Sequence, residues 1–329
     1  AEPLPSRVLI PVANPLTAEE LIRIGAALMD ERTGELTALG IVEVPEGMPL
    51  SEGATRARQA RRLLQRVLDY APEGTVIHPL VRIGRHAAAG IVEAAAEQEA
   101  DLMIFGWGGK SGAHREPGAS TISPTIDEVV REAPCDIAVV KQRGAREIRR
   151  ILVPVRGGPH AELALRIADA LAHRHDATVV VMHLVPDGVT EAVRAQAERA
   201  LASFSRQFVT ARSEPLLRET ANVRAAILRE AERSDLVVMG ASAPPGEVGG
   251  SLFGSLPEAI AQRAKPTVIV VKTREPIGRQ TFEQLAQKAE TLVAADRAAE
   301  ESRAVPARVD RWFAEANFHH SEFADLARL

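Results

Sequence analysis

Three short apolar motifs occur twice in this chain, in the same order each time. Residues 7–12 read RVLIPV and residues 150–155 read RILVPV. The other pairs are DLMIFG at 101–106 with DLVVMG at 235–240, and APCDIAVVK at 133–141 with AKPTVIVVK at 264–272. The copies lie roughly 130 to 145 residues apart, about the length of one domain. We therefore expect two like domains, at residues 1–145 and 146–274.

Both halves alternate short apolar runs with amphipathic stretches. Runs such as VVVM at 179–182 are apolar on both faces, which is typical of a parallel sheet covered by helices on each side. We predict strands at 8–12, 36–44, 75–81, 102–105, 137–140, 151–155, 177–185, 208–217, 236–239 and 268–271, of which 208–217 has the weakest pattern. We predict helices at 18–31, 52–70, 86–98, 125–132, 161–174, 190–205, 223–233 and 257–263. This order predicts two doubly wound α/β domains, each with a five-stranded parallel sheet.

Residues 275–329 differ from the rest, because no strand pattern occurs there. Residues 280–303 read as a charged, alanine-rich helix that Pro306 ends. An apolar stripe containing Trp312 and Phe313 follows within residues 309–329. We expect a helical C-terminal tail or linker that packs against another surface.

The bulk composition excludes several classes of protein. A net charge of −4 and 3% aromatic residues give no electrostatic or stacking basis for binding nucleic acid. The single Cys135 excludes a disulfide framework and a cysteine zinc site. No apolar run reaches the roughly 18 residues of a membrane span, and no secretory signal is visible. We expect a cytoplasmic protein, or, since the chain starts at Ala1, the cytosolic part of a longer membrane protein.

Ligands of doubly wound folds bind beyond the carboxyl ends of the strands. The loop after the fourth strand of the second half, residues 240–255, is rich in glycine, and a helix follows it. Backbone N–H groups and Ser255 would meet there at a helix N-terminus, where phosphate binds well. The alternative is an ordinary connector whose serine caps the helix.

Residues 6–273 resemble the universal stress protein family in both halves. The resemblance rests on APCDIAVV at 133–140 and on the glycine loops, since many members bind ATP through Gly-x2-Gly-x9-Gly-(Ser/Thr). It implies an adenine nucleotide alpha hydrolase-like fold and binding of ATP or another adenine nucleotide, with Mg²⁺ as a companion ion. The implied nucleotide-binding residues are Val155, Arg156, Val185, Gly240, Ala243, Gly254 and Ser255 in the second half, and Asn14, Gly106, Gly109 and Ser123 in the first.

Neither glycine loop matches the family pattern completely. In the second half Gly240 and the Gly254–Ser255 pair match, but Ala243 replaces a glycine and the spacer is one residue longer. In the first half Gly106 and Gly109 match, but Ser123 is followed by a proline, which removes a backbone donor. The two copies have lost different parts of the loop.

A second departure lies after the first strand of each half. ATP-binding members commonly carry an aspartate there, whereas this chain has Asn14 and Arg156. Asn14 can still accept a hydrogen bond from a nucleoside, but Arg156 cannot accept one and is suited to an anion instead. We therefore expect unequal halves, with the second the better phosphate site.

The resemblance implies a non-enzymatic, nucleotide-responsive module that acts as a stress or regulatory sensor. We expect no catalytic residue, because the loops show no evident base or metal-holding carboxylate. One alternative is the regulatory domain of a larger protein, either an amino-acid permease or a glycosyltransferase of the glucosyl-3-phosphoglycerate synthase type, which residues 309–329 weakly resemble. Another alternative is a weak ATPase.

The remaining polar candidates favour structural roles. His160 is expected to start a helix, and His183 and Cys135 are expected to lie in or near the core. His319 and the adjacent His320 point in different directions on a helix, so we expect no metal site there. The last strands, 137–140 and 268–271, are apolar edges that need cover, so we predict that the halves pack as an intramolecular pair. Two chains could also associate as a homodimer in addition to this intramolecular pairing.

Overall fold

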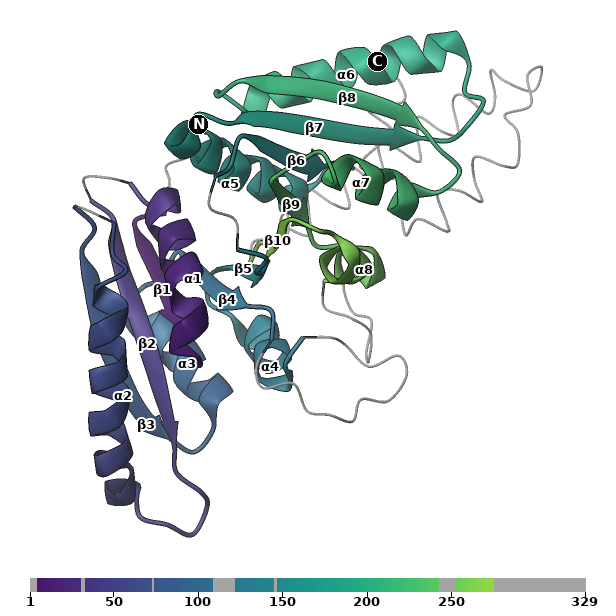
Figure 1. Ribbon diagram of the computed structural model, residues 1–329. Coiled ribbons are helices and arrows are strands. Elements are labelled where there is room, and N and C mark those ends of the chain that lie inside the picture. The colour runs from purple at the N-terminus through teal and green to yellow at the C-terminus, as the bar shows by residue number, and fades with distance from the viewer. Residues whose placement is uncertain are drawn as a thin grey trace.

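The computed structural model describes residues 5–30, 33–72, 74–108, 122–144, 147–242 and 253–274. Its ten strands form one sheet in the order β3-β2-β1-β4-β5-β10-β9-β6-β7-β8 (Figure 1). The strands of the first half are β1 (Arg7–Pro11), β2 (Glu35–Glu43), β3 (Ile77–Gly84), β4 (Leu102–Gly106) and β5 (Asp136–Lys141). Those of the second half are β6 (Arg150–Pro154), β7 (Thr178–Val185), β8 (Ser213–Glu219), β9 (Leu236–Gly240) and β10 (Thr267–Lys272).

Within each half all strand pairs are parallel, as the sequence predicts. The first strand of each half lies between the second and the fourth, so the strand order reverses beside β1 and again beside β6. In a doubly wound sheet this reversal opens a crevice at the carboxyl ends of the strands. Each half therefore has one position where a ligand of such a fold is expected to bind.

In the described part of the chain, four α-helices cover each face of the sheet. One face carries α1 (Pro15–Leu28), α2 (Gly53–Leu68), α5 (Pro159–His175) and α6 (Glu191–Phe208). The other carries α3 (Ala87–Glu97), α4 (Pro124–Glu132), α7 (Val223–Ala231) and α8 (Ser255–Arg263). Adjacent strand residues supply the two cores, since Ile10 packs in the first and Leu9 in the second. This explains why the inner strands, such as β4 and β9, are apolar on both faces, whereas the edge strands β3 and β8 also carry charged residues.

The two halves meet at β5 and β10, which pair antiparallel. Val139 lies opposite Val270 near the middle of this seam, and both side chains are fully buried. The sequence predicts that these two last strands need cover, and in the structure each covers the other. Because the pairing is antiparallel, the carboxyl ends of the two sets of strands point to opposite edges of the sheet. Association of two chains stays a prediction.

A repeated aspartate fixes the start of each half. The Asp101 carboxylate accepts hydrogen bonds from the backbone N–H of Ser6 (2.8 Å) and of Arg7 (2.9 Å). The Asp235 carboxylate does the same for Arg149 and Arg150, both at 2.9 Å. Asp101, just before β4, thus links that strand to β1, and Asp235, just before β9, links that strand to β6.

One predicted strand begins in the wrong place. The sequence pattern suggests a strand from residue 208, but α6 continues to Phe208 and β8 starts only at Ser213. The rings of Phe204 and Phe208, one helical turn apart, pack edge to face with centroids 5.0 Å apart, which extends the helix. The helices expected within residues 275–329 lie outside the described residues.

Candidate functional site

The expected ligand crevice of the second half lies at the carboxyl ends of the neighbouring strands β6, β7 and β9. Val155 follows β6 and is buried, and its N–H donates to the carbonyl of Met182 (2.8 Å). Val185 ends β7, and its carbonyl accepts from the N–H of Thr220 (2.9 Å). Arg156 follows Val155 directly and is half-buried. Three predicted residues, Val155, Arg156 and Val185, thus lie on neighbouring strand ends.

His183 holds the wall of this crevice in place. Its Nδ1 lies 3.0 Å from the carbonyl oxygen of Val155, which can only accept, so Nδ1 carries the proton. Burial lowers the pKa of His183 to about 4, so the ring is neutral near pH 7. The prediction of a buried structural histidine is confirmed.

Gly240 ends β9 and touches the first turn of α5. A Cβ at this position would lie 2.6 Å from the carbonyl carbon of His160, which is too close for any other residue. His160 Nδ1 accepts a hydrogen bond from the N–H of Thr273 (3.2 Å), and burial lowers the pKa of His160 to about 4. Packing therefore accounts for the glycine at position 240. The hydroxyl of Thr273 in turn donates to Asp136 of the first half (2.8 Å).

The start of α8 is the part of this site best suited to an anion. Gly254 precedes the helix with φ of 90° and ψ of 152°, a conformation that favours glycine. No side chain of the described residues caps this terminus, and Ser255 is the first helical residue. The N–H of Ser242 donates to the carbonyl of Phe253 (2.8 Å), which closes the base of the glycine loop. Ala243 lies outside the described residues.

The corresponding helix start in the first half is already capped. The Ser123 hydroxyl accepts from the N–H of Ile126 (3.3 Å), and Pro124 offers no N–H. A phosphate there would have to compete with the cap. Ser123 and Pro124 correspond in position to Gly254 and Ser255, so the two halves differ most at this terminus.

The other first-half candidates lie at the expected strand ends. Asn14 directly precedes α1, and its carbonyl accepts from the N–H (3.1 Å) and the hydroxyl (3.0 Å) of Thr17. Gly106 ends β4, and a Cβ there would meet Leu21 only at 3.8 Å. The glycine at 106, unlike the one at 240, is therefore not required by packing. Gly109 lies outside the described residues.

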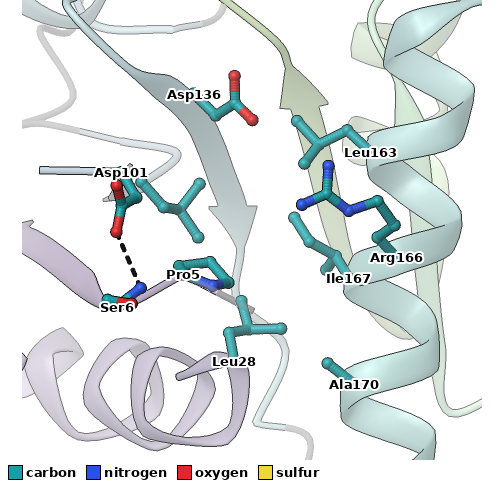
Figure 2. A pocket seen from close by; sticks show the side chains of 10 residues that line it. Pro5, Ser6, Leu28, Asp101, Asp136, Leu163, Arg166, Ile167 and Ala170 are labelled. Atoms are coloured by element: carbon teal, nitrogen blue, oxygen red, sulfur yellow. Dashed lines mark hydrogen bonds between the residues drawn. The ribbon is translucent and has the colours of Figure 1, made fainter. Parts of the chain in front are cut away.

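A separate hollow of about 370 Å³ lies at the seam between the halves (Figure 2). It is lined by Asp101 and Asp136 of the first half, and Arg166 of α5 points into it. Both carboxylates already accept hydrogen bonds, Asp101 from Ser6 and Asp136 from Thr273. The first bond joins two strand starts and the second joins the start of β5 to the end of β10, so both carboxylates serve the architecture.

Three further observations bear on chemistry. Among the described residues, no three of His, Cys, Asp and Glu gather as metal ligands do. Cys135 is buried, and burial raises the pKa of its thiol to about 12, which confirms its predicted place in the core. Within the same part of the chain, no helix is both long and apolar enough to cross a bilayer. His319 and His320 lie outside the described residues.

Two α/β halves of this strand order define the nucleotide alpha hydrolase-like class of fold, as the sequence predicts. The chain belongs to the universal stress protein family, because the model of that family matches residues 5–141 and 147–272. The match to both halves confirms the resemblance seen in the sequence.

Solved structures with the same fold cover most of the described chain. A universal stress protein from Archaeoglobus fulgidus DSM 4304 superposes with a TM-score of 0.55 at 17% identity, over 81% of this chain and 96% of its own. A functionally unknown protein from Pseudomonas aeruginosa PAO1 gives 0.52 at 15% identity, over 82% and 93%. At these identities the likeness shows the fold alone.

A relative in sequence is the Na(+)/H(+) antiporter NhaS5 of Synechocystis sp. (strain ATCC 27184 / PCC 6803 / Kazusa). The two are 30% identical over 201 residues, which are 59% of this chain. The match spans only 28% of the antiporter. This chain therefore resembles one part of a larger membrane protein.

Proposed function

We propose that this chain is a regulatory tandem module that binds an adenine nucleotide in the crevice of its second half. The observation that carries the proposal is the start of α8, which lies beyond the end of β9, has glycine at its N-cap and receives no side-chain cap from the described residues. Exposed N–H groups at a helix N-terminus bind phosphate oxygens well. The resemblance to ATP-binding stress proteins makes an adenine nucleotide the natural source of that phosphate.

Arg156 fits the phosphate end of this ligand better than the nucleoside end. It follows β6 in the crevice, where a guanidinium can pair with phosphate oxygens in two parallel hydrogen bonds. Val155 and Val185 would supply apolar contacts nearer the sheet. We propose that the first half, whose helix start is capped by Ser123, binds the nucleotide more weakly or not at all.

The two halves provide their own matched experiment. Pro124 is the first residue of α4, so proline is tolerated at the position that Ser255 holds in α8. Ser255→Pro should keep the helix and remove one N–H donor to a charged group, which weakens ATP binding by at least about tenfold. Pro124→Ser is the control, and it should leave the affinity of the second half unchanged.

Calorimetric titration with ATP, AMP and cyclic dinucleotides measures these effects. Equal affinity of the wild type and Ser255→Pro would place the ligand elsewhere. No heat with any of these nucleotides would contradict the proposed site. ATP hydrolysis that disappears in Ser255→Ala would instead favour a weak ATPase.

We further propose that the module regulates a membrane transporter to which it is joined or bound. The similarity to part of NhaS5 supports this role, with the module on the cytosolic side. Occupancy of the crevice would then favour one state of the transporter, because a ligand shifts an equilibrium only by binding the two states unequally. The gene sequence before Ala1 and after Leu329 tests the fusion: transporter spans would support it, and their absence would require a separate partner.

A further inference from the structure

Helix α2 carries a dense positive charge that the net charge of the chain conceals. Its 16 residues, GATRARQARRLLQRVL, include five arginines and no acidic residue. All five side chains belong to exposed residues, and they are Arg56, Arg58, Arg61, Arg62 and Arg66. The whole chain, by contrast, has a net charge of −4.

No described carboxylate neutralises these arginines. Arg56 donates to the backbone carbonyl of Glu43 (3.4 Å), and Arg58 donates to the hydroxyl of Thr55 (3.3 Å). Neighbouring arginines behave differently, since Arg82 on β3 forms ion pairs with two glutamates of α3. The charge of α2 is therefore available to a partner.

Three of the arginines form a row along the outer face of the helix. Arg58, Arg62 and Arg66 are spaced four residues apart, so they lie one above another on one face. The opposite face packs on the sheet through Leu64, which is buried. Like charges at this spacing destabilise an isolated helix. A row of this kind has no structural benefit within the described part of the chain.

The second half offers an internal comparison. Helix α6 occupies the place of α2 in the repeat, with the sequence EAVRAQAERALASFSRQF. It carries three arginines and two glutamates, and Arg194 is paired with both Glu191 and Glu219. The fold at this position therefore does not require an unpaired basic face.

Exposed apolar side chains gather around the same helix. Of the seven large hydrophobic residues that are exposed in the described chain, six lie between residues 48 and 83. They are Met48, Leu50, Leu63, Tyr70, Val76 and Ile83. Leu63 lies on α2 itself, while Met48 and Leu50 precede it and Tyr70 follows it. Figure 1 shows α2 and β3 at one end of the molecule, far from α6.

We propose that the exposed face of α2 binds the anionic surface of a lipid bilayer. Arginines would pair with lipid phosphates and carboxylates, and Leu63 and its apolar neighbours would enter the headgroup region. A nucleic acid would use the arginines but would leave the aliphatic side chains in water, so the combination favours lipid. The proposal depends only on α2 and its surroundings, and it stands independently of the nucleotide site.

Co-sedimentation of the full chain with vesicles tests the proposal. We expect binding to phosphatidylcholine vesicles that contain about 30% phosphatidylserine, little binding to pure phosphatidylcholine, and loss of binding at high salt. The triple variant Arg58→Gln, Arg62→Gln, Arg66→Gln should bind roughly a hundredfold more weakly, about fivefold for each arginine near the surface. Glutamine favours helices, so circular dichroism should show an unchanged fold.

The control removes the same charge from the second half. Arg206, Arg224 and Arg229 are exposed there, and their replacement by glutamine should leave vesicle binding within about twofold of wild type. Leu63→Ser should weaken binding to anionic vesicles while keeping its salt dependence, because it removes an apolar contact only. The proposal is overturned if the wild type does not bind anionic vesicles or if both triple variants lose binding equally. It is also overturned if a DNA or RNA oligonucleotide displaces the protein from the vesicles.

Discussion

Acid should destabilise this protein through two buried histidines well before most carboxylates titrate. His160 and His183 have pKa values lowered by burial from 6.5 to about 4. Between pH 6.5 and 4 both histidines stay neutral in the folded protein, while each takes up a proton in the unfolded chain. The unfolded state thus binds more protons between pH 6.5 and 4, so stability falls as the pH falls through this window and is constant above it.

The expected loss is large relative to the stability of an ordinary domain. The lowering of the pKa from 6.5 to about 4 corresponds to between about 3 and 4 kcal/mol for each histidine, or about 7 kcal/mol for both. Within the window each contributes up to about 1.4 kcal/mol per pH unit to the free energy of unfolding. His175, whose pKa burial also lowers, adds a loss of the same sign.

Urea unfolding at several pH values measures this slope, and asparagine separates the histidines. The side chain of asparagine can place an acceptor or a donor where Nδ1 lies, so His160→Asn can still accept from Thr273 and His183→Asn can still donate to Val155. Each variant should reduce the slope by about 1.4 kcal/mol per pH unit, while His86→Asn, at an exposed site, is the control. An unchanged slope in both buried variants would refute the reasoning.

Two packing predictions can be checked by thermal melting. Val270→Lys should lower the melting temperature by about 8 °C, because an unpaired charge buried at the seam costs about 4 kcal/mol. The control is Val193→Lys at an exposed position of α6, which should have almost no effect on the melting temperature. Equal melting of the two variants would show that the seam tolerates charge. Gly240→Ala should destabilise by roughly 2 kcal/mol, since its Cβ would meet the backbone of α5 at 2.6 Å. Gly106→Ala, with its nearest side chain at 3.8 Å, should cost at most about 0.5 kcal/mol, and equal costs would contradict this difference.

The fold could be predicted from the sequence because its signals are local and occur twice. Leu9 and Ile10 pack into different cores, and the continuous apolar run that contains them predicts burial on both faces of the sheet. The apolar last strands likewise indicated that each half needs a neighbour. The boundary between α6 and β8 was harder, because Phe208, Val209 and Thr210 are residue types that favour strands, although α6 continues to Phe208.

The site was only partly predictable, because its contacts join residues far apart in the chain. The strand ends that carry Val155 and Val185 follow from the alternation of elements. The contact between Gly240 and His160 gives no sequence signal, so a glycine that packing requires could be read as part of a ligand loop. The five arginines of α2 can be found in the sequence, but the net charge of −4 for the whole chain gives no sign of this local cluster.

Thr273 forms hydrogen bonds with both halves, to His160 in one and to Asp136 in the other. The backbone N–H of Thr273 thus contacts the first turn of α5, while its hydroxyl contacts the start of β5, so this one residue bridges the two halves. Fusion of the halves in one chain makes this junction independent of protein concentration, because its closure is intramolecular. A protein built from separate single domains would lose such a junction on dilution, whereas this chain would keep it at any level of expression.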